Sequence, residues 1–251
     1  LAADGVLACG QPMNVVVPTG NFGNILAAYF AREMGVPIAK LICASNDNKV
    51  LTDFIRSGAY DIRGEVRKFY CTNSPSMDIL ISSNLERLIY LICGEDSEKT
   101  KELMEELKTT GKYTITLEMK EKLADFAAGY STEEETAESI HDTYQKTGYV
   151  MDTHTAVAAH VCGQYRAKSG DQTKCVIAST ASPYKFVKSV MSAIDAENAN
   201  ADEFDLLPKL QEVSGVPMPQ AIKDILDAKV FHDLECDADK MKDTVKGILG
   251  V

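Results

Sequence analysis

The feature that most constrains the fold is the alternation of short apolar runs with segments of helical periodicity. The run MNVVVP at 13–18 is unbroken and β-branched, which is typical of a strand buried on both faces. The turn TGNFGN at 19–24 follows, and apolar residues then recur at helical spacing up to Gly35. A second apolar run at 40–44 predicts another strand, and 47–58 predicts a helix. This order predicts an α/β fold with an open, mainly parallel sheet that carries helices on both faces.

The later part of the chain adds further helices and one more strand. Apolar residues at helical spacing predict helices over 78–93 and 155–168. Between them, 95–146 is rich in charged residues, which indicates solvated helices. The run CVIA at 175–178 predicts a buried strand, and Pro183 is suited to begin the next helix.

The expected domain organisation follows from these elements. The run DAENANADEFD indicates a loop or linker after Asp195, and apolar residues near 222–226 indicate one last helix. We therefore expect an α/β domain over 1–195 with a helical insertion around 95–146. Residues 196–251 are then a C-terminal helical extension of the same domain.

Charge and hydropathy exclude two classes of partner. The chain has 26 basic and 37 acidic residues, so its formal net charge is -11. Nucleic acids and anionic membrane surfaces are bound by clustered Lys and Arg, so neither is expected as a partner. No apolar run approaches the roughly 20 residues that span a bilayer, and no signal peptide is evident. The chain lacks an initiator Met and opens within a pattern, so we expect its N-terminal part to be missing.

Cysteine and histidine usage argues against disulfides and against a metal site. The seven cysteines are odd in number, form no CxxC pair and lie partly in apolar runs, which favours a reducing cytoplasm. The histidines show no zinc-ligand spacing, so no metal is expected. They are His141, His154, His160 and His232.

The sharpest motif is VVVPTGNFGN at 15–24, where a predicted strand turns directly into a predicted helix. Gly20 and Gly23 allow positive φ and let a ligand approach the backbone closely. Free N–H groups at the helix N-terminus attract a phosphate, and Asn21 and Asn24 add side-chain donors. The spacing fits neither a Walker loop nor GxGxxG. The pattern by itself leaves two interpretations open, a phosphate site and a tight turn without a ligand.

A second polar cluster, in the sequence STASPYKF, follows the predicted strand at 175–178. Ligands of open parallel sheets lie outside the carboxyl ends of the strands, so this cluster and the glycine loop can face one crevice. Ser179, Thr180 or Ser182 can cap the helix that begins near Pro183. Alternatively, one of these hydroxyls bonds a ring nitrogen of a bound cofactor.

Five segments resemble threonine synthases in their order and approximate spacing: PTGNFGN, LICASNDNKVLTDF, SPSMDILISSNLERL, DTHTAVAAH and STASPYKF. The resemblance covers at least 13–190. It implies the tryptophan-synthase-β-like fold, pyridoxal 5′-phosphate (PLP) as cofactor, and the C-terminal portion of the enzyme. The activity implied for the intact enzyme converts O-phospho-L-homoserine and water to L-threonine and phosphate.

The resemblance also implies site residues. The loop that wraps the cofactor phosphate corresponds to Gly20, Asn21, Phe22, Gly23 and Asn24. The threonine near the pyridine nitrogen corresponds to Thr180. We expect Asp152, His154 and Thr155 to line the active site, because they lie in DTHTA, where the family usually has DPHTA. No chemical step is assigned to SPSMDILISSNLERL, which serves as a family signature only.

The lysine that forms the Schiff base with PLP lies upstream of this segment in the family. Lys40, Lys49 and Lys185 are present, but none falls in that motif. A covalent cofactor linkage needs this lysine. We therefore expect the missing N-terminal half of the enzyme as a partner, and we expect the segment alone to be inactive.

Other interpretations stay open at this point. One is another PLP-dependent lyase of the same fold, of the Ser/Thr dehydratase or cysteine synthase type, although SPSMDILISSNLERL favours threonine synthase. Another is a non-catalytic phosphate-binding α/β domain. The last is a purely structural α/β domain, in which Gly20 and Gly23 form a bare turn.

Overall fold

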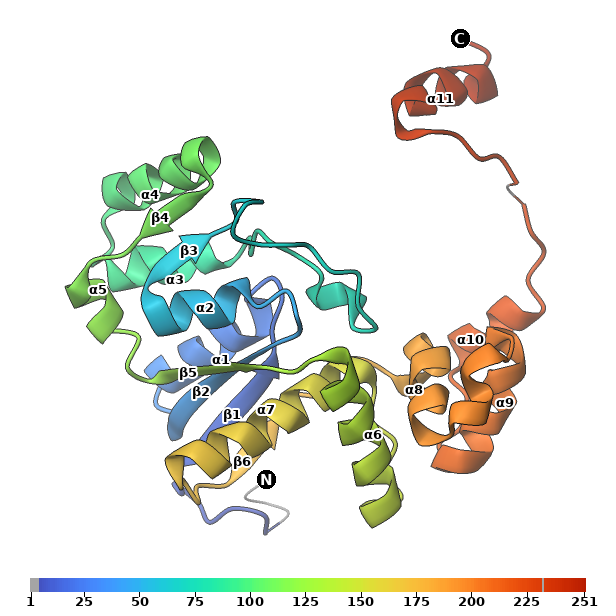
Figure 1. Cartoon of the computed structure of the whole chain (residues 1–251), viewed down its shortest axis with the longest axis horizontal. Coiled ribbons are helices and arrows are strands. Elements are labelled where there is room, and N and C mark those ends of the chain that lie inside the picture. The colour runs from blue at the N-terminus through green and yellow to red at the C-terminus, as the bar shows by residue number, and fades with distance from the viewer. Residues whose placement is uncertain (1–4, 232) are drawn as a thin grey trace. The chain divides into compact units, whose positions relative to one another are not determined.

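A computed structural model describes residues 5–231 and 233–251 (Figure 1). The chain divides into two compact units, of which the first ends at Val216 and the second comprises Pro217–Val251. The second unit holds α10 (Gln220–Leu226), a 3-10 turn η4 (Ala238–Lys240) and α11 (Met241–Leu249). All further elements belong to the first unit.

The main sheet has four parallel strands in the order β5-β2-β1-β6, so the predicted open parallel sheet is confirmed. The strands are β1 (Met13–Pro18), β2 (Ile38–Ser45), β5 (Phe126–Tyr130) and β6 (Cys175–Ile177). From β1 the chain proceeds to β2 on one side and returns much later to β6 on the other. The carboxyl ends of β1 and β6 are therefore neighbours at a point where ligands of such sheets bind.

Helices and a small second sheet surround these strands. The α-helices are α1 (Gly23–Glu33), α2 (Val50–Ser57), α3 (Leu85–Ile92), α4 (Ser97–Thr110), α5 (Leu117–Glu121), α6 (Glu133–Thr147), α7 (Thr153–Ser169), α8 (Val187–Ile194) and α9 (Glu203–Ser214). The 3-10 turns are η1 (Pro75–Met77), η2 (Pro183–Phe186) and η3 (Ala196–Asn200). The small sheet pairs β3 (Ala59–Asp61) with β4 (Lys112–Thr114). Within the described residues, no helix has the length and apolar character needed to cross a membrane.

Alternate residues of each central strand enter two separate cores. Val17 and Leu41 pack in the core that α1 to α5 contribute to. Their neighbours Val16 and Ile42 pack in a second core with Val161 of α7. Figure 1 accordingly shows α7 on one face of the sheet and α1 and α2 on the other. Because successive side chains point to opposite faces, a strand covered on both sides must be apolar throughout, which explains its unbroken apolar run.

The predicted helix over 78–93 is wrong in its first half, because α3 begins only at Leu85. The residues before it are irregular, since their polar groups bond elsewhere. The Asp78 carboxylate accepts the Thr72 N–H (2.7 Å) and the Thr72 hydroxyl (2.7 Å). Ile81, which the pattern placed on the apolar stripe, is 59% exposed. The same carboxylate accepts the Asn46 side-chain N–H (2.8 Å), so tertiary hydrogen bonds override the helical spacing here.

The stretch 95–146, predicted as a helical insertion, carries α4, α5 and α6 but also the strands β4 and β5. β5 is an edge strand of the main sheet and pairs with β2. Its sequence, FAAGY, has no β-branched residue to mark it as a strand. A Cβ at Gly129 would lie 2.8 Å from the Val161 side chain, so the glycine lets α7 approach closely. Pairing and cover by α7 make this segment a strand, and neither is visible locally.

The run after Asp195 is not the linker that its composition indicates. It contains η3 and the first three residues of α9, and α9 buries Leu206, Leu207 and Leu210 directly after the run. The first compact unit extends to Val216, beyond the division expected after residue 195. The run itself consists mainly of acidic and small residues, and the three buried leucines that follow it make α9 a packed helix.

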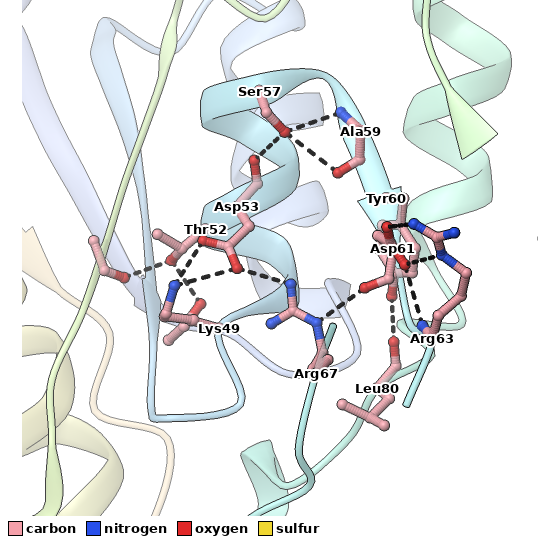
Figure 2. A network of polar contacts seen from close by, with 12 residues as sticks. Lys49, Thr52, Asp53, Ser57, Ala59, Tyr60, Asp61, Arg63, Arg67 and Leu80 are labelled. Carbon is pink, nitrogen blue, oxygen red and sulfur yellow. Dashed lines mark hydrogen bonds and ion pairs between the residues drawn. The ribbon is translucent and has the colours of Figure 1, made fainter. Parts of the chain in front are cut away.

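The small sheet supports the segment that leads into α3. The Tyr60 ring stacks on Tyr113, with ring centroids 5.4 Å apart. The Tyr60 hydroxyl donates to the Leu80 carbonyl (2.8 Å) and accepts the Ser82 N–H (2.9 Å). Figure 2 shows the Leu80 contact beside a network of ion pairs around α2 and β3. The buried Tyr60 hydroxyl therefore fixes the backbone of residues 80–82.

Candidate functional site

A cavity of about 260 Å³ opens at the carboxyl ends of β1 and β6. Its lining residues are 17–24, 76–77, 154, 180–181 and 185. The structure therefore brings the whole glycine loop and Thr180 into one crevice. This is the juxtaposition that two adjacent parallel strands impose on the loops that follow them.

The left-handed backbone of the glycine loop lies at Phe22, whose φ is 62°, and not at Gly20 or Gly23. The expectation that the glycines supply positive φ is therefore wrong. A non-glycine residue in this region costs on the order of 1 kcal/mol. The Phe22 ring is 1% exposed and lies 6.1 Å from the Phe126 ring. Burying a Phe side chain contributes about 1.5–3 kcal/mol, which offsets the strain.

The loop presents a row of unpaired amides. The first hydrogen bond of α1 runs from the Leu26 N–H to the Phe22 carbonyl (3.2 Å), and no side chain caps the helix. The N–H groups of 21–25 have no acceptor among the described residues. Helix N-termini normally satisfy such donors with a capping side chain. Left free, these donors and the positive end of the helix dipole form an anion-binding site.

Gly20 and Gly23 lack a side chain for different structural reasons. A Cβ at Gly20 would lie 2.8 Å from the Ser76 carbonyl oxygen, so the close approach of another loop requires this glycine. A Cβ at Gly23 would meet nothing nearer than the Asn84 side-chain nitrogen at 3.7 Å. The protein therefore has room for a side chain at Gly23, and that room belongs to the cavity. A ligand that approaches the backbone explains this glycine best.

His154 enters the cavity from the first turn of α7. Asp152 caps this helix, and its carboxylate accepts the N–H groups of His154 (2.9 Å) and Thr155 (3.2 Å). Burial raises the pKa of the Asp152 carboxyl, but hydrogen bonds from His154 and Thr155 outweigh burial, so this pKa lies below its usual value. The anionic carboxylate lies 3.5 Å from His154 Nδ1.

The other ring nitrogen of His154 has no partner among residues 5–231 and 233–251. The side chain is 4% exposed, and Nε2 makes no hydrogen bond within the described part of the chain. A buried polar atom without a partner costs about 1–3 kcal/mol. Because His154 lines the cavity, a ligand there can satisfy this nitrogen.

Asp152 and Thr155 were expected to line the active site, but neither lines the cavity. The Thr155 hydroxyl donates to the Asp152 carboxylate and lies 3.2 Å from the Ser179 hydroxyl. Together they connect the start of α7 to the segment after β6, and so they position His154 and its surroundings.

The hydroxyls after β6 differ in their surroundings. Ser182 accepts the Tyr184 N–H (3.3 Å) and caps η2, so the capping role belongs to Ser182. Thr180 lines the cavity, and its hydroxyl has no partner within the described residues. It is therefore available to a ligand.

Comparison with known proteins decides the family. The model for the family "Threonine synthase, C-terminal" matches residues 155–245. Threonine synthase-like 1 from Macaca fascicularis is 42% identical over 218 residues, which are 86% of this chain and 29% of that protein. The structure of PLP-bound threonine synthase from Brucella melitensis is 41% identical, with a TM-score of 0.70, and covers 76% of this chain and 40% of that one. The structure of yeast threonine synthase is 33% identical, with a TM-score of 0.78, and the match covers 95% of this chain and 48% of the yeast chain.

The chain belongs to the threonine synthase family. It spans about a third of the length of the first of these relatives and less than half of the other two. The fold predicted from the family resemblance is confirmed.

The threonine synthase signature SPSMDILISSNLERL contributes to the cavity in a way that the sequence did not reveal. Ser76 and Met77 line the cavity directly. Asn84 contacts the glycine loop from outside, since its side-chain nitrogen donates to the Asn21 carbonyl (2.8 Å). The sequence marks these three residues only as part of the signature motif. Nothing in the spacing of the motif indicates that it lies beside the glycine loop. Lys185 also lines the cavity.

The electrostatics of the cavity differ from those of the whole chain. The net charge is -11, yet no Asp or Glu is among the lining residues that the structure describes. Lys185 supplies a positive charge there, and the free amides of α1 add the helix dipole. The cavity is therefore suited to an anion in an otherwise acidic protein.

Another groove lies elsewhere in the first unit. A larger groove of about 640 Å³ lies among α1, α3 and α4, around Phe30, Tyr90 and Met104, and contains none of the predicted residues. Within 5–231 and 233–251, no group of three His, Cys, Asp or Glu residues is placed to hold a metal. His232 lies outside the described residues.

Proposed function

We propose that this chain forms the PLP-phosphate cradle of an enzyme that converts O-phospho-L-homoserine and water to L-threonine and phosphate. The observation that carries the proposal is the single cavity shared by free loop amides, Thr180 and the unpartnered Nε2 of His154. Family membership supplies the reaction class, because relatives of this chain carry the name threonine synthase.

The residues present fit a phosphorylated pyridine. Five consecutive unpaired amides, at 21–25, match the several acceptor oxygens of a phosphate. Gly23 leaves open space beside them. A relative of known structure is described as PLP-bound. The cradle therefore suits the phosphate, and Thr180 and His154 offer hydrogen bonds for the remainder of the ligand.

Each residue would have a separate role around the bound cofactor. PLP itself supplies an electron sink that stabilises carbanions. The loop amides would fix its phosphate and thereby its orientation. A neutral hydroxyl at Thr180, in place of a carboxylate, would leave the ring nitrogen largely unprotonated. Lys185 would add positive charge near the phosphate oxygens.

The lysine that attaches the cofactor is proposed to come from outside this chain. None of Lys40, Lys49 and Lys185 lies in the motif that carries the family's Schiff-base lysine, and the chain spans less than half of the threonine synthases it resembles. We therefore propose that the segment binds PLP without covalent attachment and lacks turnover alone. The cytoplasm is the compartment we propose, on the basis of the odd cysteine count and the missing CxxC.

The test is a product assay on the protein that carries this segment together with the N-terminal portion of the enzyme. PLP and O-phospho-L-homoserine are supplied, and threonine and inorganic phosphate are quantified. Equal amounts of both support the proposal, and the 251-residue chain alone serves as the inactive control. Full turnover by the chain alone would contradict the assignment of the lysine.

The same assay separates the alternative lyase function. Release of phosphate with a 2-oxo acid and ammonia, but no threonine, would assign the protein to the dehydratase type. Binding of PLP without consumption of substrate by the longer protein would favour a non-catalytic phosphate-binding domain.

A further inference from the structure

The carbonyl groups of the glycine loop are held from one side by a short polar segment. The Ser82 hydroxyl donates to the Gly20 carbonyl (2.8 Å). Asn84 donates twice to the Asn21 carbonyl, from its side-chain nitrogen (2.8 Å) and from its backbone N–H (3.2 Å). These donors belong to the run SSN at 82–84, inside the signature whose role the sequence left unassigned.

Holding a carbonyl also aims the next amide. In a trans peptide group the N–H points opposite to the C=O, and no cis peptide bond occurs among the described residues. The bond to the Gly20 carbonyl therefore turns the Asn21 N–H away from 82–84. The bonds to the Asn21 carbonyl do the same for the Phe22 N–H. Neither amide has an acceptor among the residues that the structure describes, and both residues line the cavity.

The segment that holds the loop is itself fixed in place. The Ser82 N–H donates to the buried Tyr60 hydroxyl (2.9 Å), and Ser82 is 7% exposed. Directly after Asn84, Leu85 begins α3 and is 2% exposed. A hydrogen-bond donor on such a support holds its acceptor in a narrow range of positions, as preorganised binding sites require.

We propose that Ser82 and Asn84 are positioning residues, which aim the amides of Asn21 and Phe22 at the phosphate monoester of a bound ligand. The inference rests on the proposed function and assigns to these two residues the orientation of its anion site. A second observation points to a ligand in the same cavity, namely the buried and unpartnered Nε2 of His154.

Ser83 provides a matched control within the same run. Its hydroxyl contacts the side-chain oxygen of Asn21 (3.3 Å) and no loop carbonyl. Ser83→Ala removes a hydroxyl from the same motif, as Ser82→Ala does, but it leaves the hydrogen bonds to the loop carbonyls in place. The comparison of Ser83→Ala with Ser82→Ala and Asn84→Ala therefore separates carbonyl anchoring from a general effect of the segment.

The experiment titrates the 251-residue chain with pyridoxine 5′-phosphate, which lacks the aldehyde and so cannot react with surface lysines. Inorganic phosphate is the second probe. Amide signals of residues 21–23 in two-dimensional NMR give the dissociation constant, and circular dichroism confirms folding. We expect Ser82→Ala combined with Asn84→Ala to raise the constant at least tenfold for both probes. The dissociation constant of Ser83→Ala should stay within twofold of the wild-type value. Ser82→Thr, which keeps the hydroxyl and is made in a chain that retains Asn84, should bind both probes like the wild type.

The outcomes are distinguishable. Wild-type binding with an unchanged constant in the double variant would overturn the positioning role and leave the proposed function intact. An equal loss in Ser83→Ala would overturn it as well. Failure of the wild-type chain to bind either probe would overturn both proposals. If the double variant does not fold, Asn84→Ala alone is measured, and a constant within twofold of wild type then counts against the proposal.

Discussion

Gly23 offers a test in which stability and binding should move in opposite directions. Its φ is not in the left-handed region, and a Cβ there would meet only Asn84 Nδ2, at the ordinary contact distance of 3.7 Å. Gly23→Ala should therefore cost nothing in the folded state. It should stabilise the ligand-free chain by about 0.4–1 kcal/mol, because alanine has less conformational entropy to lose on folding.

The same methyl group should weaken binding. It would stand in the cavity beside the free N–H groups, where a phosphate oxygen must come within about 2.9 Å of a backbone nitrogen. We expect the dissociation constant for pyridoxine 5′-phosphate to rise at least about tenfold, which corresponds to ~1.4 kcal/mol. Gly23→Val, with a larger side chain, should raise it further.

The assay combines urea unfolding of the ligand-free chain with ligand titration. Gly163→Ala in α7 is the control, because a Cβ there meets nothing within 4 Å and the residue does not line the cavity. It should be stabilised by about 1 kcal/mol with unchanged binding. If Gly23→Ala bound as tightly as the wild type, the open space at Gly23 would not be ligand space. If it were strongly destabilised, the local backbone argument would be wrong.

Three further predictions address other parts of the site. Thr180→Asp in the complete enzyme should lower turnover per bound cofactor while PLP absorbance still shows full occupancy; cofactor loss with normal turnover in the bound fraction would contradict its role. Tyr60→Phe should destabilise the chain by about 1–3 kcal/mol at neutral pH, since it leaves the buried Ser82 N–H unpaired. Burial raises the pKa of Tyr60 to about 12, so its contribution should be complete below pH 10 and lost as pH rises through about 12; urea midpoints of both chains across this range check it, and a constant difference would refute it. Asp152→Ala should cost about 1–2 kcal/mol through loss of the α7 cap. Because the pKa of Asp152 is lowered, this difference should be present above its usual value of 3.8 and shrink as pH falls through the lower folded-state value.

The sequence by itself determined the elements whose signals are local. β1 and α1 lie where the apolar run MNVVVP and the helical spacing after it placed them. The glycine loop between them and the hydroxyls of Ser179, Thr180 and Ser182 beyond β6 are ligand candidates, because parallel strands bring their carboxyl ends to one edge. Only the family resemblance singles out Thr180 among the three. These are properties of short segments and of the order in which they occur.

Only the tertiary structure decided the features that depend on distant partners. β5 is a strand because β2 pairs with it and α7 covers it, although FAAGY carries no strand signal of its own. The residues before α3 depart from the helical pattern because Asp78, Ser82 and Asn84 bond to Asn46, Gly20 and Asn21, which lie far away in the sequence. The positive φ of the glycine loop lies at Phe22 and not at a glycine, because burial of the Phe22 ring beside Phe126 offsets the strain. In each case long-range hydrogen bonds or burial contribute more free energy than the local preference, and no local pattern records them.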